Sequence, residues 1–128
     1  MIVLDASAWL EVTLGTASAV VTDRLARDPH WVVPEHFRVE VLNALRGARR
    51  RGVIDDAEFR HQADVLIARE FDVWPTVPLV PRIVELADNA TSYDAAYVAL
   101  AEDLGAMLVT ADRKFAGIPD IRCTLVGI

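Results

Sequence analysis

The sequence predicts an α/β fold, a three-layer α/β/α sandwich whose short, mostly parallel central sheet has four or five strands flanked by about six or seven helices. First, residues 2–4 and 106–109 form continuous apolar runs, as strands buried on both faces of a parallel sheet do. Second, segments of helical periodicity alternate with short apolar segments. Third, residues 93–101 are apolar nearly all round, which predicts a helix deep in the core.

In the first half of the chain, the apolar spacing predicts strands at 2–4 and 31–33 and three helices. The first helix covers 8–14, the second runs from its cap at Thr16 to about Arg27, and the third covers 35–51. Thr16 is a good N-cap residue, whereas Gly15, Pro34 and Gly52 end elements. The side chains expected to face the core from the second and third helices are Val20, Val21, Leu25, Phe37, Val41, Ala44 and Leu45.

In the second half, Asp55 is the expected cap of a helix, and residues 71–74 form an edge strand limited by Pro75 and Pro78. A helix follows over 79–89, and Thr91 caps the apolar helix, which Gly105 ends. Strands are expected at 106–109 and 123–126. The side chains expected to face the core from the helix after Asp55 and from the 79–89 helix are Phe59, Ala63, Leu66, Ile67, Ile83, Leu86 and Ala87.

Length and composition predict one domain, residues 1–128, with 53% hydrophobic and 25% charged residues, as in a globular protein. The single cysteine, Cys123, excludes an intrachain disulfide and a cysteine-based zinc site, and is expected to be a small core residue. No apolar run is long enough to span a membrane, and a strand beginning at residue 2 leaves no room for a signal peptide. We therefore expect a cytoplasmic protein without a membrane partner.

Four acidic residues from distant parts of the chain are expected to meet at one edge of the sheet. Asp5 and Asp112 each follow a buried strand, so their carboxylates lie close together if those strands are neighbours. Asp94 opens the helix that leads into the second of these strands, which places it at the same edge. Glu40 lies at the border of the apolar stripe of its helix. The alternatives are that Asp5 is only an N-cap and that Glu40 pairs with an arginine or points to solvent.

Four carboxylates in one cleft repel one another, and a hard divalent cation such as Mg²⁺ or Mn²⁺ would resolve that conflict. Such ions bind phosphates, activate water and promote displacement at phosphorus. They would also reverse the local sign in a chain whose net charge of −6 otherwise argues against a nucleic-acid partner. Ser7 and Thr110 stand beside the two strand-end acids. We expect them to orient a carboxylate, a metal-bound water or a phosphate oxygen, or to cap the next turn. His36 is expected to be a capping or surface residue.

Four segments resemble the motifs of PIN-domain ribonucleases, most closely the VapC-type toxins of bacterial toxin–antitoxin pairs. They are Val3-Leu4-Asp5-Ala6-Ser7-Ala8, Glu40 with Asn43-Ala44-Leu45, Tyr93-Asp94-Ala95-Ala96-Tyr97-Val98-Ala99-Leu100-Ala101, and Leu108-Val109-Thr110-Ala111-Asp112. The resemblance implies a PIN-like fold and Mg²⁺- or Mn²⁺-dependent cleavage of RNA phosphodiesters, with Asp5, Glu40, Asp94 and Asp112 as catalytic metal ligands. Ser7 and Thr110 match positions that carry a hydroxyl near the metal. It also implies a homodimer and a small antitoxin whose C-terminal segment covers the cleft.

The basic residues offer contacts to RNA or to the antitoxin. Arg46, Arg49, Arg50 and Arg51 form a cluster, which is equally explained as a solvated helix end. The candidates for contact are Arg46, Arg49 and Arg50. Arg113 and Lys114 follow Asp112, where some relatives carry a further acid. We expect either a weaker second metal site or contact of these two residues with the RNA backbone.

Three other functions share part of this sequence pattern. A phosphatase of the haloacid dehalogenase type requires a second aspartate two residues after the first, and Ser7 occupies that position. A receiver domain requires a late lysine directly after a strand, and Lys114 is badly placed for it. The remaining alternative is a non-catalytic PIN-fold protein-interaction module, which has no need for four converging carboxylates.

Overall fold

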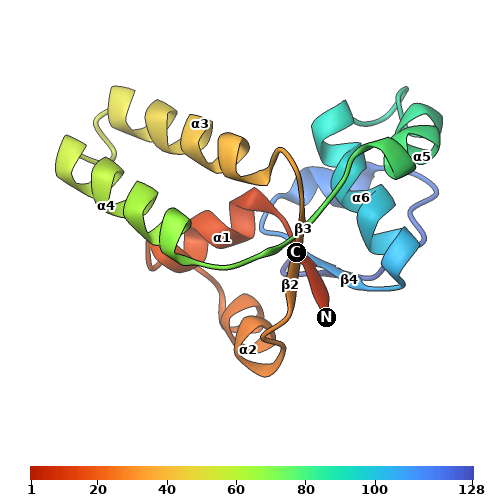
Figure 1. Ribbon diagram of the computed structural model, residues 1–128, viewed down its shortest axis with the longest axis horizontal. Helices are drawn as coiled ribbons and strands as arrows, with labels where there is room; N and C mark the ends of the chain where they lie inside the picture. The colour runs from red at the N-terminus through yellow and green to blue at the C-terminus, as the bar shows by residue number, and fades with distance from the viewer.

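The computed structural model describes all 128 residues and contains a five-stranded sheet in the order β3-β2-β1-β4-β5 (Figure 1). Every neighbouring pair of strands is parallel. The strands are β1 (Ile2–Leu4), β2 (Trp31–Pro34), β3 (Asp72–Trp74), β4 (Met107–Val109) and β5 (Leu125–Val126). The predicted α/β fold with a short, mostly parallel sheet is therefore confirmed, and the sheet is parallel throughout.

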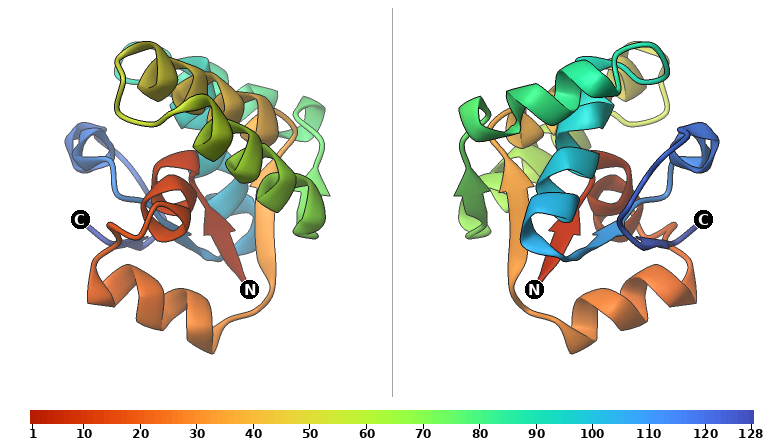
Figure 2. Two further views of the ribbon diagram at one scale, coloured as in Figure 1. Left: turned by 90° about the vertical axis from the view of Figure 1, so that its left-hand side faces the viewer. Right: turned by 90° about the vertical axis from the view of Figure 1, so that its right-hand side faces the viewer.

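Six α-helices and two short 3₁₀ helices connect the strands. They are α1 (Ala6–Thr13), α2 (Ala19–Arg27), α3 (Phe37–Arg50), α4 (Asp56–Ala68), η1 (Val77–Leu79), α5 (Val80–Glu85), α6 (Ser92–Leu104) and η2 (Arg113–Gly117). In Figure 1, α3 and α4 run side by side to the left of the strands, whereas α5 and α6 lie to their right. The side views in Figure 2 show α1 and α6 on opposite sides of β1, which gives the three layers.

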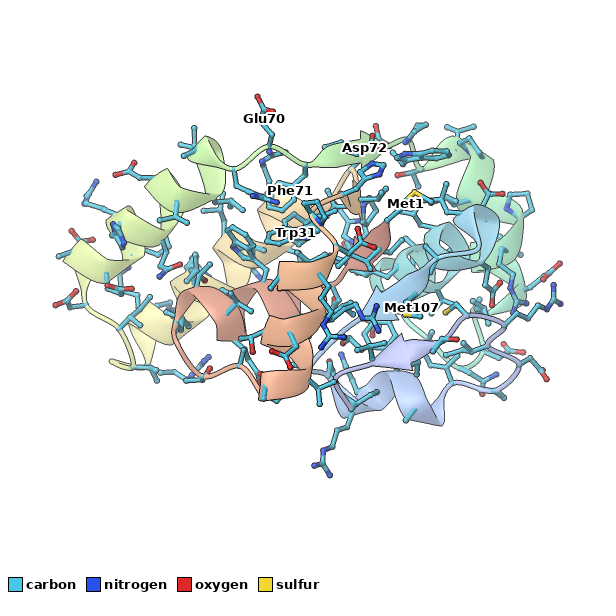
Figure 3. The ribbon with its side chains drawn as sticks, turned by 90° about the horizontal axis from the view of Figure 1, so that it is seen from below. Met1, Trp31, Glu70, Phe71, Asp72 and Met107 are labelled. Atoms are coloured by element: carbon cyan, nitrogen blue, oxygen red, sulfur yellow. The ribbon has the colours of Figure 1, made fainter.

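Strand β1 is the centre of the sheet and the point at which the strand order reverses. Its residues pair with β2 on one side and with β4 on the other, where Leu4 lies opposite Val109. Ligands of open α/β sheets bind beyond the carboxyl ends of the strands at such a reversal. Figure 3 looks onto the opposite edge, where Met1, Trp31, Asp72 and Met107 lie at or next to the starts of the strands.

A continuous hydrophobic core holds the layers together and fixes the strand ends. Helix α6 is buried without interruption from Asp94 to Ala101, as the apolar sequence predicted. On the other face of the sheet, the Trp9 ring of α1 packs edge-on against Phe37 and Phe71, with ring centroids 6.4 and 5.2 Å apart. None of the helices has the length and apolar character needed to cross a membrane.

Several helix ends and buried faces differ from the sequence predictions. The second helix is capped by Ser18 rather than Thr16, and Pro34 is the buried last residue of β2 instead of closing it from outside. The predicted 79–89 helix is shorter, because a 3₁₀ turn precedes α5 and α5 ends at Glu85. Cys123 is half-buried at the edge of the core. Four side chains expected to be buried are exposed: Val20, Ala44, Ile67 and Ala87.

Candidate functional site

Asp5 lies at the carboxyl end of β1 and begins α1 as its N-cap, so the capping role is real. Its Oδ2 atom accepts hydrogen bonds from the backbone N–H of Ser7 at 3.3 Å, from the Ser7 hydroxyl and from the Thr110 hydroxyl at 2.8 Å. The side chain is 2% exposed. Burial raises the pKa of Asp5 to about 6, and the charge of Glu40 adds to the shift, although the hydroxyl donors oppose it.

Thr110 connects the ends of β1 and β4. Besides donating to Asp5, its Oγ1 accepts from the backbone N–H of Asp112 at 3.0 Å and lies 3.2 Å from the Ser7 Oγ. The Ser7 Oγ in turn accepts from the backbone N–H of Ala111 at 3.0 Å. Both hydroxyls therefore orient the Asp5 carboxylate, and Thr110 also caps the turn that follows it. Ser7 does not cap its own following turn but holds the loop after β4.

Glu40 lies in the first turn of α3 and is held by an aromatic residue of α6. The Tyr97 hydroxyl donates to its Oε2 at 2.8 Å, and the Tyr97 side chain is fully buried. Burial, together with the neighbouring carboxylates of Glu40 and Asp5, raises the pKa of Tyr97, which keeps the hydroxyl protonated as a donor. His36 Nε2 is 3.3 Å from the same Glu40 oxygen but has no hydrogen-bond partner of good geometry.

Asp94 and Asp112 share one positively charged side chain. The Lys114 ammonium lies 3.3 Å from Oδ2 of Asp94 and 3.0 Å from Oδ2 of Asp112. Asp94 is in the first turn of α6, which Thr91 caps, and Asp112 caps η2 through the Lys114 backbone N–H at 2.9 Å. The contact with Asp112, assisted by the charge of Asp94, raises the pKa of Lys114.

Glu40 and Asp94 line a cleft of about 500 Å³ between the amino-terminal ends of α3 and α6. The residues lining it are His36, Val39, Glu40, Asn43, Thr91, Tyr93, Asp94 and Lys114. Asp5 and Asp112 are not in this lining. Asp112 contacts the lining residue Lys114, and the charge of Asp5 interacts with that of Glu40. The four predicted acids therefore gather at one edge of the sheet, but no three acidic, histidine or cysteine side chains are arranged to hold one metal ion.

The basic residues considered for binding divide into two groups. Arg49 stacks over the Phe59 ring at 4.2 Å and pairs with Asp56 at 3.0 Å, so it joins α3 to α4. Arg46 and Arg50 are exposed on α3. Their spacing places them on the same helix face as the cleft residues Val39 and Asn43, farther from the cleft. Arg113 is exposed next to Lys114 and makes no ion pair.

Three site residues were not assigned a role from the sequence. Tyr97 was interpreted only as part of an apolar helix, although a buried tyrosine hydroxyl needs a partner, and that requirement is a usable signal. His36, expected to be a cap or surface residue, occupies the N-cap position of α3 without a side-chain capping bond. It also contacts Glu40 and packs edge-on against the rings of Tyr93 and Tyr97, 5.5 and 5.1 Å away. Tyr93, 64% exposed, stands at the cleft wall.

Comparison with known proteins identifies the family and similar folds. The PIN domain family model matches residues 2–121. Ribonuclease VapC12 of Mycobacterium tuberculosis is 39% identical over 120 residues, which cover 91% of this chain and 90% of that protein. The crystal structure of PAE2754 from Pyrobaculum aerophilum superposes with a TM-score of 0.70 at 23% identity, covering 97% of this chain and 81% of that one. A chain of a toxin–antitoxin complex from Klebsiella pneumoniae gives 0.59 at 19% identity, with 93% of each covered.

Proposed function

Since the chain belongs to the PIN-domain family, within its VapC group, we propose that it is a metal-dependent endoribonuclease and the toxin of a toxin–antitoxin pair. The observation that carries this proposal is that Asp94 and Asp112 both contact the Lys114 ammonium, beside a cleft that Glu40, Asp94 and Lys114 line. A scaffold that only binds protein has no need for this concentration of carboxylates at the reversal point of its sheet. The relative VapC12 is named a ribonuclease, which supports the same activity.

Mg²⁺ or Mn²⁺ fits this site by its donor chemistry. The side chains that would hold it are Asp5, Glu40, Asp94 and Asp112, which offer only oxygen atoms, as hard divalent ions prefer. His36 is the one imidazole in the lining, so the site does not favour zinc. The positive charge already seated between Asp94 and Asp112 supports a preference for a cation there. When bound, such an ion would supply Lewis acidity for phosphodiester hydrolysis.

The protein's own residues prepare the site and the substrate. Ser7 and Thr110 fix the Asp5 carboxylate, and Tyr97 fixes that of Glu40, so these two acids keep one orientation without a ligand. We propose that the exposed Tyr93 ring stacks on a base of single-stranded RNA at the cleft. Arg46 and Arg50 are placed to neutralise phosphates along α3, whereas Arg49 is engaged with α4.

The proposed protein partner is a cognate antitoxin that presents a basic side chain to the carboxylates of the cleft. The fold shared with a chain of the Klebsiella toxin–antitoxin complex supports such a partner. The homodimer and the cytoplasmic location stay predictions. The molecular mass of the purified chain in solution decides the first.

The experiment that tests the activity compares wild-type protein with Asp94→Asn. Mn²⁺ is titrated by calorimetry, and total RNA is digested in parallel. We expect the wild type to bind Mn²⁺ and cleave RNA, and Asp94→Asn to lose both, because Asp94 would contribute a charged ligand. Asp103→Asn is the matched control, since Asp103 is an exposed acid on the same helix without an ion pair. It should bind and cleave like the wild type.

A folded wild-type protein that binds no Mn²⁺ and cleaves none of a set of structured RNAs would contradict the proposal. It would favour the alternative, a non-catalytic PIN-fold interaction module. Equal behaviour of wild type and Asp94→Asn would mean that Asp94 is structural.

A further inference from the structure

Lys114 is the only lysine of the chain, among thirteen basic residues of which all others are arginine. Its ammonium contacts two of the four acids of the site, Asp112 in the loop after β4 and Asp94 in the first turn of α6. The side chain is 65% exposed and forms part of the cleft wall. It therefore has direct access to solvent, unlike the hydroxyls that hold Asp5.

We propose that Lys114 is a resident counter-cation that competes with the divalent metal, so that metal binding requires its ammonium to leave Asp94 and Asp112. The inference rests on the proposed metal-dependent function and adds a determinant of metal affinity to it. The consequence is a site that holds its metal more weakly than its four acids alone would.

The contact distances support exchange rather than coexistence. The ammonium holds the two carboxylate oxygens 3.3 and 3.0 Å from its nitrogen. Mg²⁺ binds carboxylate oxygens at about 2.0–2.1 Å, closer than an ammonium does, so a divalent ion held by the same two acids would need the space that the ammonium occupies. A lysine ammonium in the same space would then meet a divalent charge at close range, which is strongly unfavourable.

The residue type also favours exchange. A lysine presents a compact point charge on a flexible stem, whereas arginine makes planar, two-point contacts with carboxylates that are harder to displace. Although the Asp94 side chain is largely buried, the Lys114 ammonium is open to solvent, which screens both ion pairs and reduces their contribution to stability. The two contacts are accordingly too weak to explain Lys114 as a structural clamp for η2, yet they neutralise charge at the mouth of the cleft when no metal is bound.

The first test is calorimetric titration of Mn²⁺ into wild type, Lys114→Met and Arg113→Met. Methionine keeps the unbranched stem and removes the charge. We expect Lys114→Met to bind Mn²⁺ about tenfold more tightly, the order expected when two surface ion pairs no longer compete with the ion. Arg113→Met removes an equal charge from the neighbouring exposed residue and should change the affinity by less than about twofold, because that charge is screened by salt.

The second test measures the ammonium itself, and the single lysine makes it specific. An amine-acetylating reagent is applied with and without Mn²⁺, and acetylation of Lys114 and of the amino terminus is followed by mass spectrometry. The amino terminus, paired with Asp28, is the internal reference. We expect Mn²⁺ to accelerate acetylation of Lys114 severalfold. In Asp94→Asn the lysine should react faster already without metal, with no further increase.

The outcomes separate this inference from the proposed function. If wild type binds Mn²⁺ and cleaves RNA but Lys114→Met binds Mn²⁺ equally or more weakly, the inference is wrong and the proposed function stands. Unchanged lysine reactivity on metal binding also overturns it. If no variant binds Mn²⁺ and none cleaves RNA, the proposed function fails and the inference fails with it.

Discussion

Replacing Thr110 with valine tests how the sheet edge holds its acids. The Thr110 side chain is fully buried, and its hydroxyl donates to Asp5 at 2.8 Å and accepts from the Asp112 N–H at 3.0 Å. Valine has nearly the same shape but puts a methyl group in place of the hydroxyl. The substitution therefore removes a donor to a buried carboxylate and an acceptor for a backbone N–H, with little change in packing volume.

The expected loss of unfolding free energy follows from these two bonds. A hydrogen bond to a charged group contributes about 1.5–3 kcal/mol and a neutral one about 0.5–1.5 kcal/mol. Because the Asp112 loop is only partly buried, water can replace part of the second bond. We therefore expect Thr110→Val to lose about 2–3 kcal/mol at about pH 7.5.

The loss should depend on pH through Asp5. Burial raises the pKa of Asp5 in the folded protein to about 6, above the unfolded value of about 3.9. The contribution of Asp5 to the free energy of unfolding is therefore fully present below the unfolded pKa and is lost as pH rises through the folded pKa of about 6. Removing the Thr110 donor raises the pKa further and penalises only the charged form. At about pH 5 the loss should accordingly shrink to about 1 kcal/mol.

The assay is urea unfolding in metal-free buffer, followed by the fluorescence of the three tryptophans, at both pH values. Thr110→Ser keeps the hydroxyl and loses one buried methyl group, so it should cost about 1 kcal/mol or less and show no added pH dependence. If valine and serine variants are equally stable at about pH 7.5, or if the valine loss is the same at both pH values, the Thr110 hydroxyl does not stabilise the Asp5 carboxylate.

Two further predictions concern the arginines. The double substitution Arg46→Glu and Arg50→Glu, made in the Asp94→Asn background that should be inactive, should weaken binding of a single-stranded RNA about tenfold. It should also reduce the salt dependence of binding, because fewer phosphates are neutralised. Unchanged binding in a filter assay would show that these two arginines of α3 do not contact the RNA. Arg82→Met should cost about 2 kcal/mol in urea unfolding at neutral pH, since the Arg82 guanidinium donates to Glu102 at 2.7 and 3.2 Å where both side chains are largely buried. The Arg82 contact lowers the pKa of Glu102 despite burial. The loss of unfolding free energy should therefore decrease as pH falls below the ordinary pKa of a glutamate. A loss that is independent of pH would show that the ion pair contributes nothing to stability.

The strands and the buried helix were predictable because each of their sequence patterns is compatible with only one structural interpretation. An apolar run of three or four residues bounded by an acid or glycine has few other places in a folded chain, and β1 and β4 follow that pattern. The continuous burial of α6 from Asp94 to Ala101 likewise leaves no ambiguity of face. The sequence prediction that brings Asp5 and Asp112 together depends on β1 and β4 being neighbours, and the two strands do pair in parallel.

The errors arose where a helix face was chosen from apolar identity alone. Val20 and Ile67 are apolar, but they lie next to Val21 and Leu66, which point to the core and leave their neighbours outside. On α4 the buried position goes instead to Gln62, whose amide donates to the Thr13 carbonyl at 3.1 Å. A single sequence does not reveal such a polar anchor, because its partner is a backbone atom far away in the chain.

The site was predictable as a gathering of acids and not as a set of contacts. Topology alone placed Asp5, Asp94 and Asp112 at one sheet edge, and the roles of all four acids await the metal and cleavage measurements. What the sequence could not show is how each charge is held without a ligand. Tyr97 of α6 contacts Glu40 of α3, and Lys114 of η2 contacts Asp94 of α6. Both contacts depend on how distant elements pack together.

These contacts divide the four carboxylates into two kinds by the means that hold them. Asp5 and Glu40 are held by neutral hydroxyl donors whose positions are fixed in the core, so their orientation survives the loss of any cation. Asp94 and Asp112 are held by an exposed ammonium that can move away. A divalent ion that entered the cleft would therefore find the first pair in place and would need to displace Lys114 from the second. Metal affinity should then respond to Lys114 in one direction and to Thr110 in the other, tighter without the ammonium and weaker without the hydroxyl.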